Sequence, residues 1–205
     1  EPYRRQRQMC IRDRQYSDCR KPVVFVIDMV NGFIKEGALH DERIADIIPS
    51  IQKLLDALAC RNVFVCDNHP PHTREFETFP KHCVIGSEEA EVVDELKPYV
   101  KSWISKNSTN TFHAQAFQEF LQEDLDYYQD IVVVGCCTDL CVLHFVLTLQ
   151  TWLNEHNKKE YRIIVPKNCT ETYDIPEIHP ASKWNQVAWD MMQMNGVCVV
   201  DQLVD

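Results

Sequence analysis

Residues 23–28 read VVFVID, an uninterrupted run of β-branched and aromatic side chains that ends in an acid. Such a run is typical of a strand that is buried on both faces of a sheet. Further short apolar runs recur along the chain, and we predict a strand at each of them. They lie at residues 62–67, 101–105, 131–135, 161–165 and 197–200.

Amphipathic stretches separate these predicted strands. In the first of them, residues 41–60, isoleucine and leucine recur at the three- and four-residue spacing of a helix. The same pattern predicts helices at residues 88–99, 112–125, 138–156 and 182–195. Alternating strands and helices predict an α/β fold, a three-layer α/β/α sandwich around a Rossmann-like, six-stranded parallel sheet. The glycine-rich patterns that bind nucleotide phosphates are absent from the sequence.

The composition is that of an ordinary globular protein. Of the 205 residues, 45% are hydrophobic and 25% are charged, and the net charge is −10. This acidic balance argues against nucleic acid and anionic membranes as partners. No apolar run approaches the roughly 20 residues of a membrane span, and we find no signal peptide. We therefore expect the ten cysteines to belong to a reducing, cytoplasmic protein rather than to a disulfide-bonded scaffold.

Residues 1–20 differ in composition from the rest of the chain. This stretch is rich in arginine and has neither strand nor helix periodicity. We predict that it is a disordered or non-native N-terminal arm, and that residues 21–205 form one domain. A short basic tail that contacts an acidic partner is the alternative interpretation.

Several residues whose side chains can take part in acid–base or nucleophilic chemistry end or follow the predicted strands. Asp28 ends the first strand and Asp67 the second, Lys106 follows the third, and the cysteine-rich stretch GCCTDLCVLH, residues 135–144, follows the fourth. An open parallel sheet places its ligands at the carboxyl ends of its strands. We therefore expect these groups to converge at one edge of the sheet.

Cys141 is the candidate nucleophile of this edge. It falls in the first turn of the predicted helix, where Thr138 or Asp139 is placed to cap the helix and the helix dipole favours a thiolate. Asp28 and Lys106 would then act as base and stabilising cation. A buried structural cysteine is the alternative. Cys136 and Cys137 continue an apolar strand, and for their sulfur atoms the structural interpretation is favoured.

The stretch DNHPPHTREFETFPKHC, residues 67–83, has the spacing of a metal site. Asp67, His69 and His82 form a set of two histidines and one carboxylate, which suits a divalent transition metal with open coordination positions. Glu75 or His72 is placed to add a fourth ligand. A polar, histidine-containing loop is the alternative. A zinc site built from the cysteines is disfavoured, since no paired C-x-x-C elements are present.

Aromatic residues border the same predicted edge. Phe33 follows Asp28, Phe79 precedes His82, and Phe112 follows Lys106. Aromatic walls at a catalytic edge are suited to hold a flat ring between them. Each of these phenylalanines is equally compatible with an ordinary place in the core.

Together, VVFVIDMVNGF, DNH…FPKHCVIGSEEAE, the isolated Lys106 and GCCTDLCV resemble the isochorismatase-like cysteine hydrolases of the nicotinamidase/pyrazinamidase type. The resemblance spans essentially residues 21–205. It implies a catalytic triad of Asp28, Lys106 and Cys141, in which the cysteine attacks a carboxamide carbon. It also implies an oxyanion hole formed by the backbone amides of Cys137 and Cys141, and a cis peptide bond between Cys136 and Cys137.

The resemblance places a metal on Asp67, His69 and His82, with Glu75 matching the fourth ligand of some members. Zn²⁺ suits this set, and Fe²⁺ or Mn²⁺ are alternatives. The substrate-binding positions are Phe33, Phe79 and Phe112.

The implied function is hydrolysis of nicotinamide to nicotinate and ammonia through a thioester, a step of NAD salvage. The expected partner is a small-molecule amide, and a homo-oligomer is compatible with this interpretation. A related cysteine hydrolase acting on another small amide or carbamoyl compound is the nearest alternative. A catalytically silent binding member of the fold is an alternative from another class of function.

Overall fold

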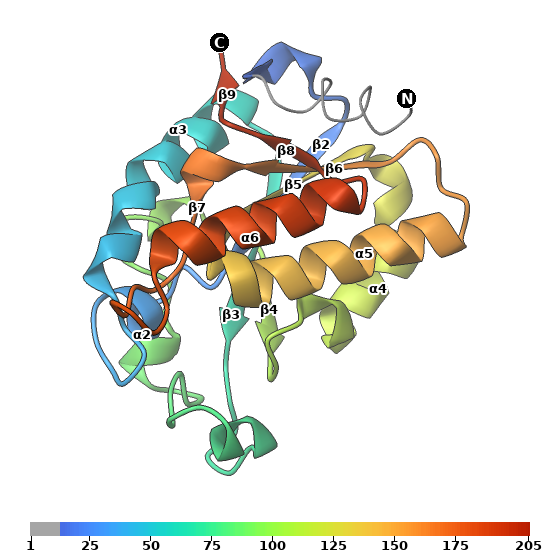
Figure 1. The fold of residues 1–205 in the computed structure, drawn as a ribbon. Coiled ribbons are helices and arrows are strands. Elements are labelled where there is room, and N and C mark those ends of the chain that lie inside the picture. The colour runs from blue at the N-terminus through green and yellow to red at the C-terminus, as the bar shows by residue number, and fades with distance from the viewer. Residues whose placement is uncertain (1–12) are drawn as a thin grey trace.

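A computed structural model of the chain describes residues 13–205 (Figure 1). Its main sheet is parallel, with the strand order β4-β3-β2-β5-β6-β8 and a short strand β7 paired to the end of β5. The strands are β2 (Pro22–Ile27), β3 (Arg61–Asp67), β4 (Trp103–Lys106), β5 (Asp130–Cys136), β6 (Arg162–Pro166), β7 (Thr170–Glu171) and β8 (Cys198–Val200). Every strand predicted from the sequence is confirmed, and the short β7 is an addition.

The central strand β2 shows why the apolar run is continuous. Val24 and Val26 point into one hydrophobic cluster of the core, whereas Val23, Phe25 and Ile27 point into the other. All five side chains are fully buried. A strand with helices on both of its faces has no solvent-facing side, so neither set of alternate positions is polar.

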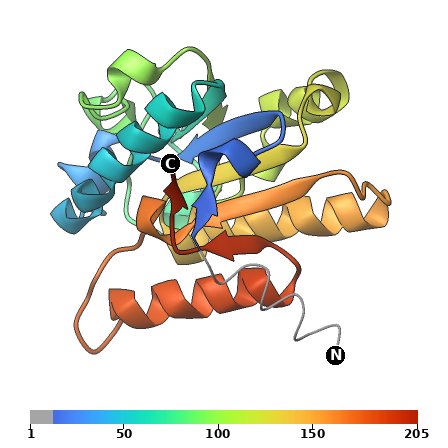
Figure 2. The same cartoon turned by 90° about the horizontal axis from the view of Figure 1, so that it is seen from above.

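Helices cover both faces of the sheet, as the three-layer prediction requires (Figure 2). One face carries α2 (Asn31–Ile34), the 3₁₀ helix η2 (Glu42–Ile47) and α3 (Ile48–Leu58). The other face carries α4 (Gln115–Glu123), α5 (Leu143–Glu155) and α6 (Ala181–Met194). None of the helices within residues 13–205 is both long and apolar enough to cross a membrane.

The helix predicted over residues 88–99 is wrong. The structure has only the short 3₁₀ turns η4 (Glu88–Ala90) and η5 (Lys97–Tyr99) there. Between them Val92 forms a bridge with Val30, just before α2, and the amide of Val93 donates to the carbonyl of Met29 at 3.0 Å. The apolar side chains that suggested a helix, such as Val93 and Leu96, are buried from this irregular segment instead. Tertiary hydrogen bonds therefore override the local spacing.

The folded domain begins earlier than the predicted boundary at residue 21. Strand β1 (Arg14–Gln15) pairs in parallel with β9 (Leu203–Val204) near the C-terminus. The backbone amide of Arg20 donates to the buried carboxylate of Asp130 at 2.7 Å, and Arg162 binds the same carboxylate. The remainder of the predicted arm, residues 1–12, lies outside the described residues.

Candidate active site

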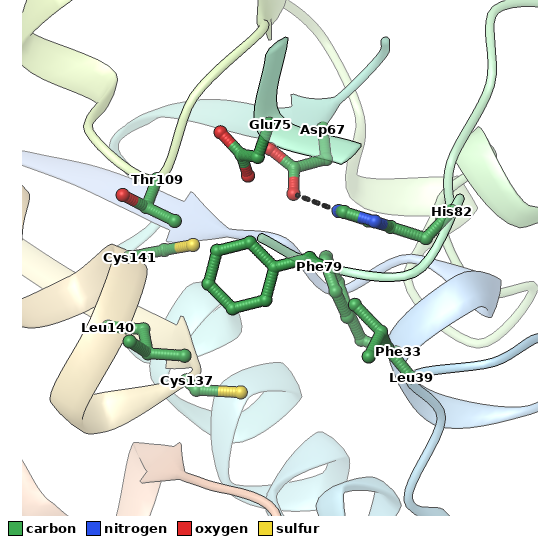
Figure 3. Close-up of a pocket in the computed structure, with 10 residues that line it drawn as sticks. All are labelled: Phe33, Leu39, Asp67, Glu75, Phe79, His82, Thr109, Cys137, Leu140 and Cys141. Atoms are coloured by element: carbon green, nitrogen blue, oxygen red, sulfur yellow. Dashed lines mark ion pairs between the residues drawn. The ribbon is translucent and has the colours of Figure 1, made fainter. Parts of the chain in front are cut away.

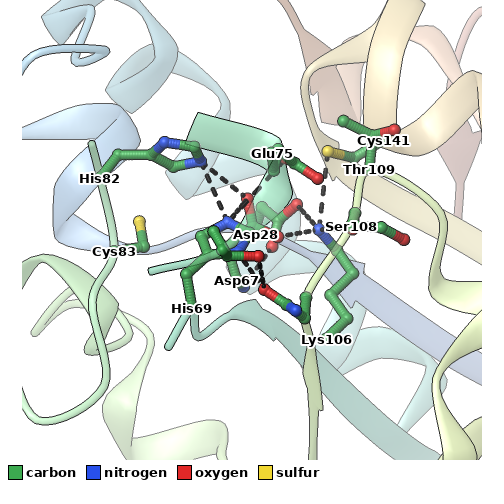
Figure 4. A network of polar contacts seen from close by, with 12 residues as sticks. Asp28, Asp67, His69, Glu75, His82, Cys83, Lys106, Ser108, Thr109 and Cys141 are labelled. Carbon is green, nitrogen blue, oxygen red and sulfur yellow. Dashed lines mark hydrogen bonds and ion pairs between the residues drawn. The ribbon is translucent and has the colours of Figure 1, made fainter. Parts of the chain in front are cut away.

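The candidate catalytic residues lie at the carboxyl ends of four neighbouring strands. In the order β4-β3-β2-β5, these strands lead to Lys106, Asp67, Asp28 and the turn that carries Cys141. Figure 4 shows the four side chains pointing toward one another from these different elements. The sheet therefore brings together groups that are up to 113 residues apart, counted from Asp28 to Cys141.

Asp28, Lys106 and Cys141 form one buried cluster. The Lys106 ammonium lies 2.8 Å from Oδ2 of Asp28 and 3.7 Å from Sγ of Cys141. A carboxylate oxygen of Asp28 lies within 4.8 Å of the same sulfur. All three residues are at most 5% exposed. The cluster has the composition that an acid–base-assisted thiol nucleophile requires.

The backbone around Asp28 fixes the direction of its side chain. The residue has a φ of 51°, in the left-handed region, at the point where β2 ends. Its amide donates to the carbonyl of Val65 at 2.8 Å, and its Oδ1 accepts from the amide of Asp67 at 2.9 Å. One carboxylate oxygen is thus tied to the neighbouring strand end, while the other faces Lys106.

Charges in this cluster are unevenly balanced, since two carboxylates surround one ammonium. Burial raises the pKa of Asp28 to about 6, with the Asp67 carboxylate adding to the shift and Lys106 opposing it. Burial acts in the same direction on Asp67, but Lys106 and hydrogen bonds from His69 and His82 outweigh it and lower its pKa below the usual range. Burial would lower the pKa of Lys106, but Asp28 and Asp67 raise it well above its ordinary value.

Cys141 rests as a thiol. Burial raises its pKa well above the ordinary value, and Lys106 offsets this only in part. The side-chain cap expected from Thr138 or Asp139 is not formed. Cys141 lies in a single π-helical turn, η8 (Thr138–Val142), before α5 begins, and no side chain caps that turn. The nucleophile depends on a base to remove its proton, and Asp28 is the adjacent carboxylate that is ionised at neutral pH.

The turn before Cys141 is built from a glycine and a cis peptide bond. Gly135 has a φ of 114°, and a Cβ atom there would meet the backbone of Ile27. Only glycine allows β5 to lie this close to β2. The cis peptide bond predicted between Cys136 and Cys137 is present. The carbonyl of Cys137 then accepts from the amides of Leu140 and Val142, which closes the turn.

A second set of side chains meets beside the first. Ligand atoms of Asp67, His69, Glu75 and His82 all lie within 4.8 Å of one another. The Nε2 atoms of the two histidines are 3.2 Å apart, and each is 3.5 Å from Oδ2 of Asp67. Glu75 lies 3.9 Å from Nε2 of His69, whereas the alternative fourth ligand, His72, is exposed.

The hydrogen bonds of the two histidines fit a metal. Nδ1 of His69 lies 2.7 Å from Oδ1 of Asn107, and Nδ1 of His82 lies 2.7 Å from the carbonyl oxygen of Pro80. Because both partners are acceptors, each Nδ1 carries a proton, so each ring in its neutral form would present the lone pair of Nε2 to a metal. Two lone pairs and a carboxylate directed at one point are the donor set of a divalent cation.

Sequence reasoning did not single out Asn107, which directly follows Lys106. Its Oδ1 accepts from His69 and also from the Thr73 hydroxyl at 2.9 Å. A metal-binding histidine commonly donates its second ring N–H to an oxygen acceptor, which fixes the orientation of the ring. A polar residue immediately after a catalytic strand end is the sequence signal that would have found it.

A pocket opens above Cys141 and beside the candidate metal ligands. Figure 3 shows the ring of Phe79 between Cys141 and His82, with Phe33 and Leu39 below it. The pocket lining comprises Phe33, Leu39, Asp67, Glu75, Phe79, His82, Thr109, Cys137, Leu140 and Cys141. It continues into an outer cavity of about 600 Å³. The pocket thus has apolar walls, with the Cys141 thiol at one end and Asp67, Glu75 and His82 at the other.

Phe112, the third predicted substrate-binding residue, lies elsewhere. Its ring packs 5.6 Å from that of Phe117 and 6.5 Å from that of Trp152, against the core below α4 and α5. The short turn η6 (Thr111–His113) directs the side chain there. Leu39 and Leu140 contribute the additional pocket walls, and no periodicity in the sequence marks Leu39 for this position.

Comparison with known proteins adds to this geometry. The profile of the isochorismatase domain matches residues 22–201. Nicotinamidase 1 of Arabidopsis thaliana is 27% identical over 213 aligned positions, which cover 87% of this chain and 84% of that protein.

Solved structures share the fold. A nicotinamidase from Bacillus subtilis superposes with a TM-score of 0.68 at 22% identity, covering 88% of this chain and 99% of the other. A cysteine hydrolase from Pseudomonas syringae reaches a TM-score of 0.71 at 21% identity over 88% of each chain. N-carbamoylsarcosine amidase from Thermoplasma acidophilum gives 0.65 at 20% identity, over 90% and 99%.

Proposed function

Since the chain belongs to the isochorismatase family, we propose that it is a cysteine amidase that hydrolyses nicotinamide to nicotinate and ammonia. The observation that carries the proposal is the placement of two sets of groups around one pocket. Cys141 stands at one end with Asp28 and Lys106 behind it, and the Asp67–His69–His82 cluster stands at the other. A flat ring between them would have its carboxamide at the thiol and its ring nitrogen at the metal ligands.

The first half of the reaction acylates Cys141. Asp28 accepts the thiol proton as the sulfur attacks the carboxamide carbon, and the carbonyl oxygen becomes an oxyanion. Backbone amides of Cys137 and Cys141 would stabilise this oxyanion. The intermediate collapses with cleavage of the C–N bond, and the proton on Asp28 passes to the leaving nitrogen, which departs as ammonia. A thioester remains on Cys141.

The second half releases the acid. Asp28, again ionised, takes a proton from water as its oxygen attacks the thioester carbon. The C–S bond breaks, the proton on Asp28 returns to the sulfur, and the acid leaves, losing its own proton to water to give nicotinate. Lys106 remains protonated throughout. Its positive charge stabilises the negative charge that develops on sulfur, and it limits the upward shift of the Asp28 pKa.

Asp67, His69, Glu75 and His82 are proposed to hold a divalent metal, with Zn²⁺ first and Fe²⁺ or Mn²⁺ as alternatives. When bound, the metal supplies a Lewis-acid contact for a ring nitrogen or a water molecule. Phe33 and Phe79 would hold the ring between them. We infer that the enzyme acts in NAD salvage in the cytoplasm, where a thiol nucleophile stays reduced.

The second candidate is hydrolysis of another small amide or carbamoyl compound. The outer cavity favours it, because its space beside Phe33, Leu140 and Tyr173 would accept a substituent that nicotinamide lacks. A catalytically silent binding protein is disfavoured, because such a protein has no use for a buried thiol beside a carboxylate and an ammonium.

An ammonia-release assay over nicotinamide, pyrazinamide and a series of carbamoyl compounds tests the proposal. Nicotinamide should give the highest kcat/KM. Cys141→Ala should abolish turnover, whereas Cys137→Ala, which changes a neighbouring sulfur in the same pocket, should retain most of it. Full turnover by Cys141→Ala would exclude the nucleophile assignment, and a carbamoyl compound as the best substrate would favour the second candidate.

A further inference from the structure

The nucleophile turn η8 carries a side chain that the reaction above does not use. The carboxylate of Asp139, two residues before Cys141, points away from the pocket toward the segment that joins β7 to α6. Its Oδ1 accepts from the Thr172 hydroxyl at 2.5 Å, and its Oδ2 lies 2.7 Å from Nε2 of His179. Both His179 and the Asp139 carboxylate are largely buried.

Two oxygen atoms hold the ring of His179 from opposite sides. Its Nδ1 lies 2.9 Å from the carbonyl oxygen of Tyr173. Its Nε2 lies 2.7 Å from Oδ2 of Asp139. Because both ring nitrogens have a partner, His179 has one fixed orientation in which Nε2 faces the Asp139 carboxylate.

Aromatic rings cover both faces of His179. The Tyr173 ring is stacked 3.8 Å away at an angle of 11°, and the Trp184 ring 5.4 Å away at 4°. Stacking on both faces fixes the plane of the imidazole ring. Burial and the Asp139 carboxylate raise the pKa of Tyr173, which keeps that ring neutral. The Lys183 ammonium lies 5.4 Å from the Trp184 centroid.

The segment that holds His179 is anchored on its other side to the mouth of the pocket. The amide of Asp174 donates to Oδ2 of Asp41 at 2.8 Å, and Arg43 donates to the carbonyl oxygen of Thr172 at 3.4 Å. Tyr173 lines the outer cavity together with Cys137 and Leu140. Asp139 thus provides a polar connection between this anchored segment and the nucleophile turn.

We propose that His179 is a positioning residue, whose ring holds Asp139 and thereby keeps the Cys137–Cys141 turn in the shape that directs its backbone amides at the oxyanion. The proposal rests on the proposed amidase function for its catalytic consequence. The clamp itself, the contact of His179 with Asp139 that restrains η8, does not depend on which amide is hydrolysed.

The catalytic test uses His179→Phe, which keeps an aromatic ring in the stack but removes both ring nitrogens and so the contact with Asp139. We expect kcat to fall about 10- to 100-fold with KM changed less than about twofold, since only the transition state uses the oxyanion hole. Alkylation of Cys141 by iodoacetamide forms no oxyanion, so its rate should stay within about twofold of wild type. Trp184→Phe, which changes the stack but not the contact with Asp139, is the matched control and should keep kcat within about threefold.

Two outcomes would overturn the catalytic role. One is an unchanged kcat in His179→Phe. The other is a parallel loss of turnover and of Cys141 alkylation, which would mean general disruption of the site. Asp139→Asn combined with His179→Phe should be no slower than the slower single variant, because both act through the same contact. Additive losses would contradict a shared contact.

If wild type releases ammonia from no amide, only the proposed function is contradicted. The clamp is then tested by measurements that need no substrate. Nitrogen NMR should show different Nε2 resonances for His179 in wild type and in Asp139→Asn, because Nε2 contacts the Asp139 carboxylate. Hydrogen exchange at the Leu140 and Val142 amides should be about tenfold faster in His179→Phe than in wild type. Identical His179 resonances in the two proteins, or unchanged exchange at both amides, would exclude the clamp.

Discussion

Asp28 and Asp67 end adjacent strands, are both fully buried, and both contact the Lys106 ammonium. Their pKa values nevertheless move in opposite directions, upward to about 6 for Asp28 and downward for Asp67. The difference comes from what lies on the far side of each carboxylate. Asp67 faces two histidines, whereas Asp28 faces the neutral thiol of Cys141 and the negative charge of Asp67.

This contrast shows how one ammonium serves two sites. A carboxylate whose pKa is near neutrality suits a general base, and one that is ionised at every working pH suits a metal ligand. Lys106 sits between them and keeps both in place. The predictions below separate the two carboxylates by experiment.

The largest effect should come from Asp28→Asn, which preserves shape but removes the base. We expect kcat to fall by about 10³- to 10⁴-fold, because Asp28 is the group assigned to take the proton of Cys141. Ammonia release under saturating amide measures it. Metal content should stay that of wild type, and a loss of metal together with activity would mean that the two carboxylates do not have separate roles.

Asn107→Ala addresses the metal side of the comparison. Removing the amide that orients His69 should weaken Zn²⁺ affinity by about 10- to 100-fold, measured by competition with a chelator. Ser108→Ala, one residue further along the same loop, is the control and should leave affinity unchanged. Equal affinities in wild type and Asn107→Ala would argue against His69 as a ligand.

The pH dependence of kcat/KM should report Asp28 alone. Because the base must be ionised, activity should fall as the pH drops through about 6, the raised pKa of Asp28, and not near the ordinary value of 3.8. The profile is measured at several fixed metal concentrations. A midpoint near pH 4 would contradict the raised pKa, and a midpoint that moves with metal concentration would report metal loss instead.

The smallest effect is on stability and has opposite signs for the two residues. Asp67, with a lowered pKa, stabilises the fold above the unfolded-state pKa, and this contribution is lost as the pH falls through the folded value. Asp28, with a raised pKa, contributes stability below 3.8 that is lost as the pH rises through about 6. Urea unfolding of the chelated protein at neutral pH should therefore show Asp67→Asn destabilised by about 1–3 kcal/mol, and Asp28→Asn less so. The reverse order would contradict the assigned directions.

Much of the fold could be predicted because the strands are continuous apolar runs. A segment such as residues 23–28 has no polar face, so it is stable only between two layers of helices. Residues 88–99 could not be predicted in this way. Their apolar spacing resembles a helix, but their backbone bonds to Met29, which is about sixty residues away in sequence.

The amino-acid sequence by itself determined the strands, their alternation with helices, and the residues at the strand ends. Asp28, Asp67, Lys106 and Cys141 were placed at one edge by the rule that parallel strands share a direction. The short spacing from Asp67 to His69 was likewise a local property.

Only the tertiary structure decided how these groups are charged and which distant residues support them. The opposite pKa shifts of Asp28 and Asp67, the resting thiol of Cys141, the place of Phe112 in the core and the pairing of Asp139 with His179 all arise from burial and contacts between separate segments. Burial and Coulomb interactions depend on distance in space, and a linear pattern of residues does not contain that distance.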